Sequence, residues 1–266
     1  MLIDFHTHAF PDKLAERALG TLAAKVRMVP ETNGSVQGLI EQMDHCGVDR
    51  SVVCNIATNA KQMINVNNFA IETLQTYGER LTPLGSINPQ AERQSEEIER
   101  LRKAGIPGLK LHPDYMGFRI DDRIYDEIFD TAAALGMFII IHAGFDVYSP
   151  GKVWAPPCAV RKRLERNPQT TLICAHFGGN MMWSEVEETL LGRNIYIDTS
   201  MGSVEGLSCE QASRMLGKHD SDRILFGSDC PWNNPGETFR YVDSLSVSDE
   251  IKEKIYYGNA SALLRL

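Results

Sequence analysis

The residues in this chain best suited to chemistry are histidines and one aspartate that end short apolar segments. His6 and His8 come first, in the segment Ile3-Asp4-Phe5-His6-Thr7-His8. Residues i and i+2 of a strand point to the same face, so these two imidazoles lie side by side at the end of a strand. Two neutral imidazoles on one face are half of a zinc site. An isolated pair of histidines is equally compatible with an exposed polar surface, so the choice between a metal site and a polar surface depends on the rest of the chain.

Later apolar segments end in residues of the same kind. These residues are Lys110, His112, His142, His176 and Asp229. Imidazole nitrogens with one carboxylate suit Zn²⁺, and Mn²⁺ or Fe²⁺ bind similar ligands. An open coordination position would hold a water, whose pKa the ion lowers toward about 7. Asp229 would take the proton of that water, and His176 would hydrogen-bond the substrate or the developing oxyanion.

Eight strand-like segments alternate with helical sequence and would position these residues. Strands are predicted at residues 2–8, 48–57, 81–88, 106–112, 137–142, 171–176, 194–200 and 223–229. Helices are predicted at 12–24, 36–46, 66–77, 96–103 with Ser95 as its cap, 121–135, about 158–166, from Ser184, 210–216, 237–244 and from 249 onward. The alternation predicts one (β/α)8 barrel, a single domain over residues 1–266, with its chemistry at the carboxyl ends of the strands.

Two segments exceed what such a barrel needs for its connections. Residues 9–34 form a long insertion after the first strand, and residues 143–157 form a loop after the fifth. Long loops in compact domains more often carry function than mere connection. Aromatic residues in loops expected at the mouth offer an apolar wall for a ring or an acyl chain. They are Phe10, Tyr148, Trp154 and Trp232.

Composition narrows the class of partner. With 27 basic and 35 acidic residues the net charge is −8, which disfavours a nucleic-acid partner and favours a small-molecule substrate. The six cysteines show no C-x-x-C spacing, and no basic and apolar leader precedes the first strand, so we expect reduced thiols in a cytoplasmic protein. No apolar run approaches the roughly 20 residues that cross a bilayer, so no membrane association is expected.

Taken in order, the motifs resemble the amidohydrolase superfamily, in particular the amidohydrolase-related (amidohydrolase 2) branch that includes aminocarboxymuconate semialdehyde decarboxylase. The matching segments are Ile3–His8, Gly108–Pro113, Ile141–Gly144, Ala175–Gly179, Tyr196–Ser200, Leu225–Trp232 and Tyr257–Ala260. The resemblance implies metal ligation by His6, His8, His142 and Asp229. It also implies that His176 lies beside the metal as a catalytic or substrate-orienting group, and that a homodimer is one assembly to expect.

Three residues keep alternative interpretations. Lys110 and His112 share a strand face, and we interpret both as substrate-binding residues at the mouth. For Lys110 the alternatives are a carbamate bridging two metals, as in binuclear relatives, and a salt bridge to Asp198 or Asp229. Asp4, expected on the same strand face as His6, either orients a ligand imidazole or is a hydrogen-bonded core carboxylate.

Three functions are compatible with this constellation. The first is a metal-dependent hydrolase of a small amide, lactone or ester, in which a metal-bound hydroxide attacks the carbonyl. The alternative is a non-oxidative carboxy-lyase, a decarboxylase of a small aromatic or enoic acid, in which Asp229 or His176 handles a proton. The third is a barrel that binds a ligand or a structural metal without catalysis. Deoxyribonucleases of the TatD type and PHP phosphoesterases share the opening His-x-His but need further carboxylate or histidine motifs that this chain does not offer.

Overall fold

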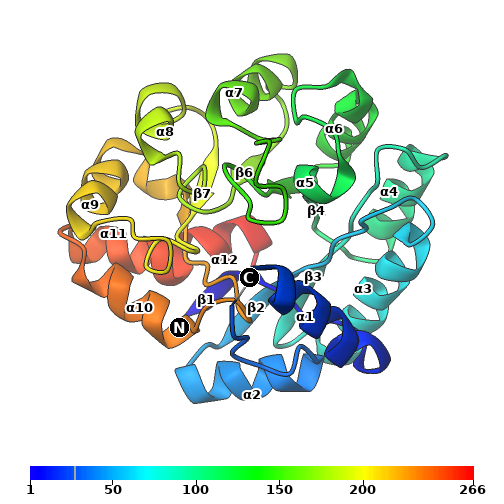
Figure 1. The fold of residues 1–266 in the computed structure, drawn as a ribbon, viewed down its shortest axis with the longest axis horizontal. Helices are drawn as coiled ribbons and strands as arrows, with labels where there is room; N and C mark the ends of the chain where they lie inside the picture. The colour runs from blue at the N-terminus through cyan, green and yellow to red at the C-terminus, as the bar shows by residue number, and fades with distance from the viewer. Residues whose placement is uncertain (27) are drawn as a thin grey trace.

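The computed structural model describes residues 1–26 and 28–266, and a ring of helices surrounds the strands (Figure 1). The strands in the described residues are β1 (Ile3–Thr7), β2 (Arg50–Cys54), β3 (Leu81–Leu84), β4 (Gly108–Leu111), β5 (Phe138–Ile141), β6 (Leu172–Cys174), β7 (Tyr196–Asp198) and β8 (Ile224–Leu225). The α-helices are α1 (Asp12–Val26), α2 (Val36–Cys46), α3 (Met63–Tyr77), α4 (Gln94–Lys103), α5 (Pro113–Met116), α6 (Asp126–Ala134), α7 (Pro157–Arg166), α8 (Trp183–Thr189), α9 (Cys209–Lys218), α10 (Pro235–Ser244), α11 (Asp249–Glu253) and α12 (Asn259–Leu264). Short 3₁₀ turns at Arg123–Tyr125 and Ser221–Arg223 and a π-helical turn at Lys254–Gly258 complete the list.

The strands close into a barrel through two narrow seams. Continuous parallel pairing joins β1 to β3 and β4 to β8. A single bridge between Gly85 and Leu109 links the first group to the second, and one between Thr7 and Cys230 closes the ring. Backbone hydrogen bonds from Phe5 to Phe226 and from Lys110 to Gly85 reinforce these seams. The predicted (β/α)8 fold is confirmed.

Apolar side chains fill two layers of the barrel. Residues facing the outer helices, such as Ile139 and Ile141 of β5, belong to the larger hydrophobic cluster. The alternate residues Phe138 and Ile140 belong to a second cluster inside the barrel, which Ala260 of α12 joins. This alternation is the period of two that a strand covered on both faces requires. The layers make the barrel a packed core, so space for a ligand remains only at its mouth.

The helix ends show where the sequence prediction was wrong in detail. Ser35 caps α2 as its side chain accepts a hydrogen bond from the Gly38 N–H. Ser95, expected to cap the next helix, lies inside α4 instead, and its hydroxyl bonds Glu127. The short helix α5, which begins with Pro113, was not predicted. None of the helices in the described ranges is long and apolar enough to cross a membrane.

Candidate active site

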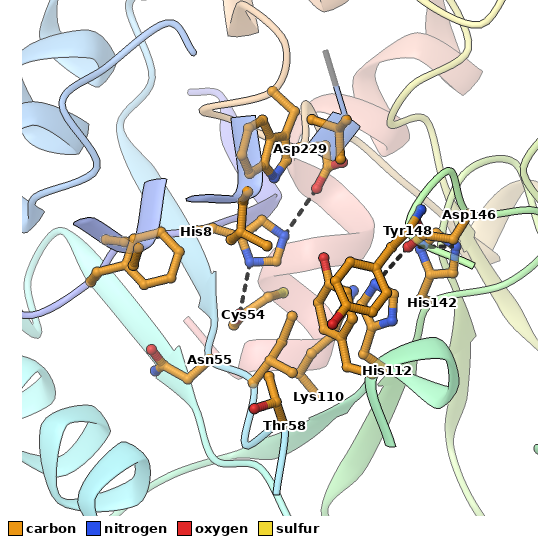
Figure 2. A pocket seen from close by; sticks show the side chains of 18 of the residues that line it. His8, Cys54, Asn55, Thr58, Lys110, His112, His142, Asp146, Tyr148 and Asp229 are labelled. Carbon is orange, nitrogen blue, oxygen red and sulfur yellow. Dashed lines mark hydrogen bonds and ion pairs between the residues drawn. The ribbon is translucent and has the colours of Figure 1, made fainter. Parts of the chain in front are cut away.

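A cavity of about 590 Å³ opens at the carboxyl ends of the strands. The side chains that the sequence predicted to meet all line it: His6, His8, Lys110, His112, His142, His176 and Asp229. Figure 2 shows five of them approaching one another from different parts of the barrel. Sequence reasoning therefore placed these residues together correctly, although their individual roles remain predictions.

A bulge in β1 aims the first histidine into this cavity. Asp4 pairs with Ser51 of β2, but Thr7 pairs with Val53, so β1 carries one extra residue. Such a bulge turns consecutive side chains toward one face and is common beside active sites. Phe5 consequently packs inside the barrel while the next residue, His6, lines the cavity. The expectation that Asp4 and His6 follow simple strand alternation was wrong for this reason.

Asp4 itself is a buried core carboxylate. It accepts hydrogen bonds from the backbone N–H groups of His6 and Ser228, and it bonds the Ser228 hydroxyl. Burial raises the pKa of its carboxyl to about 7, against the lowering effect of the Ser228 hydrogen bonds. Because its contact with His6 is through the backbone, the second of the two alternatives for Asp4 is the one observed.

His6, His8 and Asp229 bring three metal-ligating atoms together. The Asp229 Oδ1 atom lies 3.0 Å from His8 Nε2 and 3.3 Å from His6 Nε2. Ligands bound tetrahedrally to Zn²⁺ at 2.0–2.1 Å are separated by roughly 3.3 Å, so these spacings fit one shared cation.

The far nitrogen of each ring is held by an acceptor. His8 Nδ1 lies 2.9 Å from the Cys54 carbonyl oxygen, and His6 Nδ1 lies 2.9 Å from Asp198 Oδ2. Because these oxygens only accept hydrogen bonds here, each Nδ1 carries a proton, and each ring turns its Nε2 atom toward Asp229. Two ring nitrogens and a carboxylate oxygen that converge in this way can share one cation. The donor chemistry therefore fits a divalent metal.

Ionisation states support the same interpretation. Burial, followed by the nearby Lys110, lowers the pKa of His6 well below its usual value, so the ring is neutral at pH 7. Burial alone would raise the pKa of the Asp229 carboxyl, but the His6 and His8 rings outweigh it and hold that pKa below its ordinary value. A neutral imidazole beside an ionised carboxylate is the state in which both bind metal.

Lys110 lies against the same group of ligands. Its Nζ is 2.8 Å from His6 Nε2, and its side chain is only 1% exposed. Within the described residues the structure shows no ion pair between Lys110 and Asp198 or Asp229, so the salt bridge, one of the two alternatives for Lys110, is not observed and this hydrogen bond is found instead. A metal bound to His6 would use the same lone pair, which would release Nζ toward the cavity.

Asp198 of β7 connects several of these groups, and sequence reasoning did not recognise it as a site residue. Its Oδ2 accepts from His6 Nδ1, and its Oδ1 accepts from the backbone N–H groups of His176 and Ser200. The Ser200 hydroxyl contacts both Asp198 Oδ1 and, at 2.7 Å, His176 Nδ1. Asp198 thus orients one ring directly and the other through Ser200. The i and i+2 spacing of Asp198 and Ser200 was the available signal.

His142 stands apart from the predicted ligand set. Its Nδ1 lies 2.9 Å from His176 Nε2, and its Nε2 lies 3.8 Å from Asp146 Oδ2. In the described residues it groups with His112 and Asp146 and not with His6, His8 and Asp229. Its ligation of the same metal therefore stays a prediction.

Asp146, in the loop after β5, is a second residue that the sequence did not indicate. Its Oδ2 lies 3.2 Å from His112 Nε2, and its Oδ1 accepts from the Tyr148 N–H. Burial lowers the pKa of His112 to about 3, assisted by His142, so this ring is neutral and donates to the Asp146 carboxylate. The His112 and His142 rings stack with centres 4.3 Å apart and almost parallel, and their nitrogens together with an Asp146 oxygen form a second group of potential ligand atoms.

Two site residues adopt a backbone conformation that is strained for their type. His176 has φ +61° and Asp229 has φ +69°, both in the left-handed region. Hydrogen bonds hold these turns, because the His176 N–H donates to Asp198 Oδ1 and the Asp229 N–H donates to the His6 carbonyl. Strain of this kind, of order 1–3 kcal/mol per residue, persists only where surrounding contacts fix the chain.

Aromatic residues from the loops expected at the mouth line the cavity as predicted, with one exception. Phe10, Tyr148 and Trp232 face the cavity. Trp154 is not part of its lining, and its ring lies beneath the Lys152 ammonium, 3.4 Å from ring centre to Nζ. The apolar wall is therefore completed by other residues, chiefly from α1.

Comparisons with known proteins identify relatives. A family model described as amidohydrolase matches residues 3–266. The chain is 25% identical over 214 residues to a 2-keto-4-carboxy-3-hexenedioate hydratase from Sphingobium sp. (strain NBRC 103272 / SYK-6), a match that covers 65% of this chain and 61% of the hydratase. It therefore spans less than two thirds of that relative.

Solved structures show the same fold. The structure is similar to 5-carboxyvanillate decarboxylase from Sphingomonas paucimobilis, with a TM-score of 0.72, 16% identity and coverage of 100% of this chain and 99% of that one. It is also similar to a dihydroxybenzoic acid decarboxylase from Polaromonas sp. JS666 with bound manganese, with a TM-score of 0.72, 16% identity and coverage of 100% and 97%. At these identities the likeness concerns the fold alone.

Proposed function

This chain belongs to the amidohydrolase family, and from that premise we propose that it is a metal-dependent carboxy-lyase that decarboxylates a small aromatic or enoic acid. The observation that carries the proposal is the convergence of His6 Nε2, His8 Nε2 and Asp229 Oδ1 beside the buried Lys110 Nζ. With a divalent ion held by these ligands beside the Lys110 side chain, the floor of the cavity would be positive and would bind an organic carboxylate.

The relatives favour a lyase over the hydrolase that was the first expectation from sequence. The similar proteins named above are two decarboxylases and a hydratase, all of which act on or form carboxylic acids according to their names. Hydrolysis of an amide, lactone or ester therefore becomes the second candidate. It keeps the same ligands and uses Asp229 as the base that takes a proton from water.

The metal would be held by His6, His8 and Asp229, with His142 as the predicted fourth ligand. When bound, a divalent ion would act as a Lewis acid that polarises the oxygen atoms of the substrate. Mn²⁺ and Zn²⁺ both suit this nitrogen and oxygen ligand set, and a similar structure contains manganese. We propose one of these two ions, with Fe²⁺ as a further candidate.

The remaining residues bind the acid and move one proton. Lys110, released from His6, and the neutral His112 contact the substrate. The reaction breaks the bond between the carboxyl carbon and its neighbour, releases CO₂, and leaves an electron pair on the neighbouring carbon. Asp229 or His176 first takes the proton that the acid carries as R–COOH and then returns it to that carbon, so that R–COOH becomes R–H and CO₂. Water is not consumed, which distinguishes this reaction from hydrolysis.

The test is an assay of the protein loaded with Mn²⁺ or with Zn²⁺ against a mixed panel of hydroxybenzoic acids, enoic acids, lactones and amides. We expect release of CO₂ from one or more of the acids. In D₂O the product should carry one deuterium on the carbon that lost its carboxyl group. Release of new acid from a lactone or amide, without CO₂, would replace this proposal with the hydrolase.

Variants link the activity to the proposed ligands. His6→Ala and Asp229→Asn should abolish turnover and leave the circular dichroism spectrum of the barrel unchanged. His45→Ala is a matched control, because His45 is exposed on α2 and does not line the cavity. Full activity in either ligand variant would refute the metal site.

A further inference from the structure

Helix α1 presents an apolar stripe to the cavity. Leu14, Ala18, Leu22 and Val26 lie at intervals of four residues, and all four line the cavity. Side chains at this spacing occupy one side of a helix. Over twelve residues at 1.5 Å each, the stripe is roughly 18 Å long. Ala15 and Leu19 are the buried residues of the same helix, so a different side of α1 anchors it to the protein.

The stripe spans the mouth of the barrel. At one end α1 begins four residues after His8 and so starts beside the proposed metal ligands. Near its other end, Lys25 Nζ lies 4.1 Å from the centre of the Tyr148 ring in the loop after β5. Tyr148 in turn contacts Tyr115, which stacks on His112. Helix α1 therefore crosses from the metal side of the cavity to the His112 side.

Helix α3 supplies the opposite apolar wall. Val66 and Phe69, three residues apart on α3, line the same cavity, as does Ile56 in the connection that follows β2. In the view of Figure 1 the ribbon of α1 passes in front of the barrel on the side where α3 lies. The two helices thus line this part of the cavity with mainly apolar side chains, with Arg17, Thr21 and Asn65 as polar exceptions, and this slot is continuous with the polar floor of His6, His8, Lys110 and His112.

From this division of the cavity we infer that the substrate is amphiphilic: a carboxylic acid whose polar head binds the floor and whose extended acyl or aryl body fills the slot between α1 and α3. The inference rests on the proposed function for the position of the head. A small, fully polar acid would leave the stripe of α1 exposed to water. The unfavourable free energy of this exposure grows with the apolar area of the stripe. The cavity volume, about 590 Å³, is in the range of sites that enclose a whole ligand.

The test uses straight-chain hydroxamic acids from acetyl to decanoyl, whose head binds metal and stays constant while the chain grows. Their dissociation constants for the Mn²⁺-loaded protein are measured by calorimetry. We expect affinity to rise about fourfold per methylene, the effect of burying one CH₂ group. Over four methylenes this amounts to roughly 250-fold. Affinity that does not depend on chain length would overturn the inference.

Three variants locate the effect. Leu22→Gln should lower the ratio of decanoyl to acetyl affinity at least tenfold, because it places an amide in the slot. Ala18→Trp should also lower that ratio, by filling the slot with apolar atoms, which separates loss of space from loss of hydrophobicity. Ala24→Gln, on the exposed side of α1, should leave the ratio unchanged. Equal ratios in all three variants would contradict the slot.

The result is separable from the proposed function. If the chain-length dependence is present and no acid of the panel releases CO₂, the lyase proposal fails while the slot stands. If CO₂ is released and the dependence is absent, the lyase stands and the amphiphilic substrate is refuted.

Discussion

Substitution of Asp198 tests most directly how the structure fixes the orientation and the tautomer of a proposed metal ligand, His6. In Asp198→Asn the side-chain oxygen must stay at the Oδ1 position, because the backbone N–H groups of His176 and Ser200 both donate to it. The new NH₂ group then replaces Oδ2 and faces the His6 Nδ1–H, where two donors oppose each other. His6 relieves the conflict by moving its proton to Nε2, the nitrogen that would bind the metal.

The expected effect is on metal affinity first. Removing the partner that fixes a ligand histidine typically weakens metal binding 10- to 100-fold, or about 1.4–2.8 kcal/mol. The assay is a competition titration of Mn²⁺ or Zn²⁺ against a chromophoric chelator, combined with thermal unfolding of the metal-free protein. Asp198→Glu does not restore the contact, because the longer side chain displaces the same oxygen atoms.

Asp4→Asn is the matched control. Asp4 is as buried as Asp198, but it contacts His6 only through the backbone N–H and otherwise bonds Ser228. An asparagine oxygen accepts the same two N–H groups, and its NH₂ donates to the Ser228 hydroxyl. Wild-type metal affinity in Asp198→Asn, or an equal loss in Asp4→Asn, would refute the argument that Asp198 acts by selecting the His6 tautomer.

Three further predictions follow from the site. Lys110→Met should bind at least as much metal as the wild type, since Lys110 competes for the His6 lone pair. The KM of this variant for the acid should rise. If elemental analysis finds two equivalents of metal in the wild type and one in the variant, Lys110 is instead the carbamate that bridges two metals. In the metal-free protein His112 should cost stability on acidification between pH 6.5 and about 3, by up to about 1.4 kcal/mol per pH unit, because burial lowers its folded pKa to about 3 and the unfolded state therefore binds the extra proton. Asp4 acts in the opposite direction, since burial raises its folded pKa to about 7, so the measurement compares the wild type with His112→Gln by urea unfolding at pH 7 and pH 5. We expect a larger loss of stability in the wild type, and an equal loss in the two proteins would argue against this. Asp146→Asn removes the carboxylate that accepts from His112 and should raise KM severalfold with a smaller change in kcat, as judged by steady-state kinetics on whichever acid the panel identifies.

The barrel and the meeting of its polar residues were predictable because both depend on simple periodicities. Alternation of apolar strands with helices fixes the fold, and closure brings the strand ends together regardless of their separation in sequence. Histidine is rare enough in this chain that its recurrence after such strands was informative. This logic predicted that His6, His8 and Asp229 meet at the mouth with four other residues, whereas their assignment as ligands came from the family resemblance, which also included His142.

Other parts of the site depend on features without such a period. The bulge in β1 has no clear signal in the sequence, so the position of Asp4 was misjudged. Asp146 lies in an irregular loop, and its contact with His112 depends on the path of that loop. Asp198 was considered only as a partner for Lys110, because a single carboxylate in a strand does not reveal which of several rings it will face.

The strand ends show why prediction is least exact where function is concentrated. The sequence predicted strands extending to His176 and Asp229, whereas β6 ends at Cys174 and β8 at Leu225. His176 and Asp229 have a left-handed backbone conformation, which cannot continue a ladder of parallel hydrogen bonds. The turn that follows β6 contains His176, so this turn both ends the strand and directs the imidazole into the cavity. Asp229 lies four residues beyond the end of β8, and its backbone N–H donates to the His6 carbonyl of β1. Prediction from strand periodicity fails at both places because the backbone there serves the position of a site residue and not the pairing of strands.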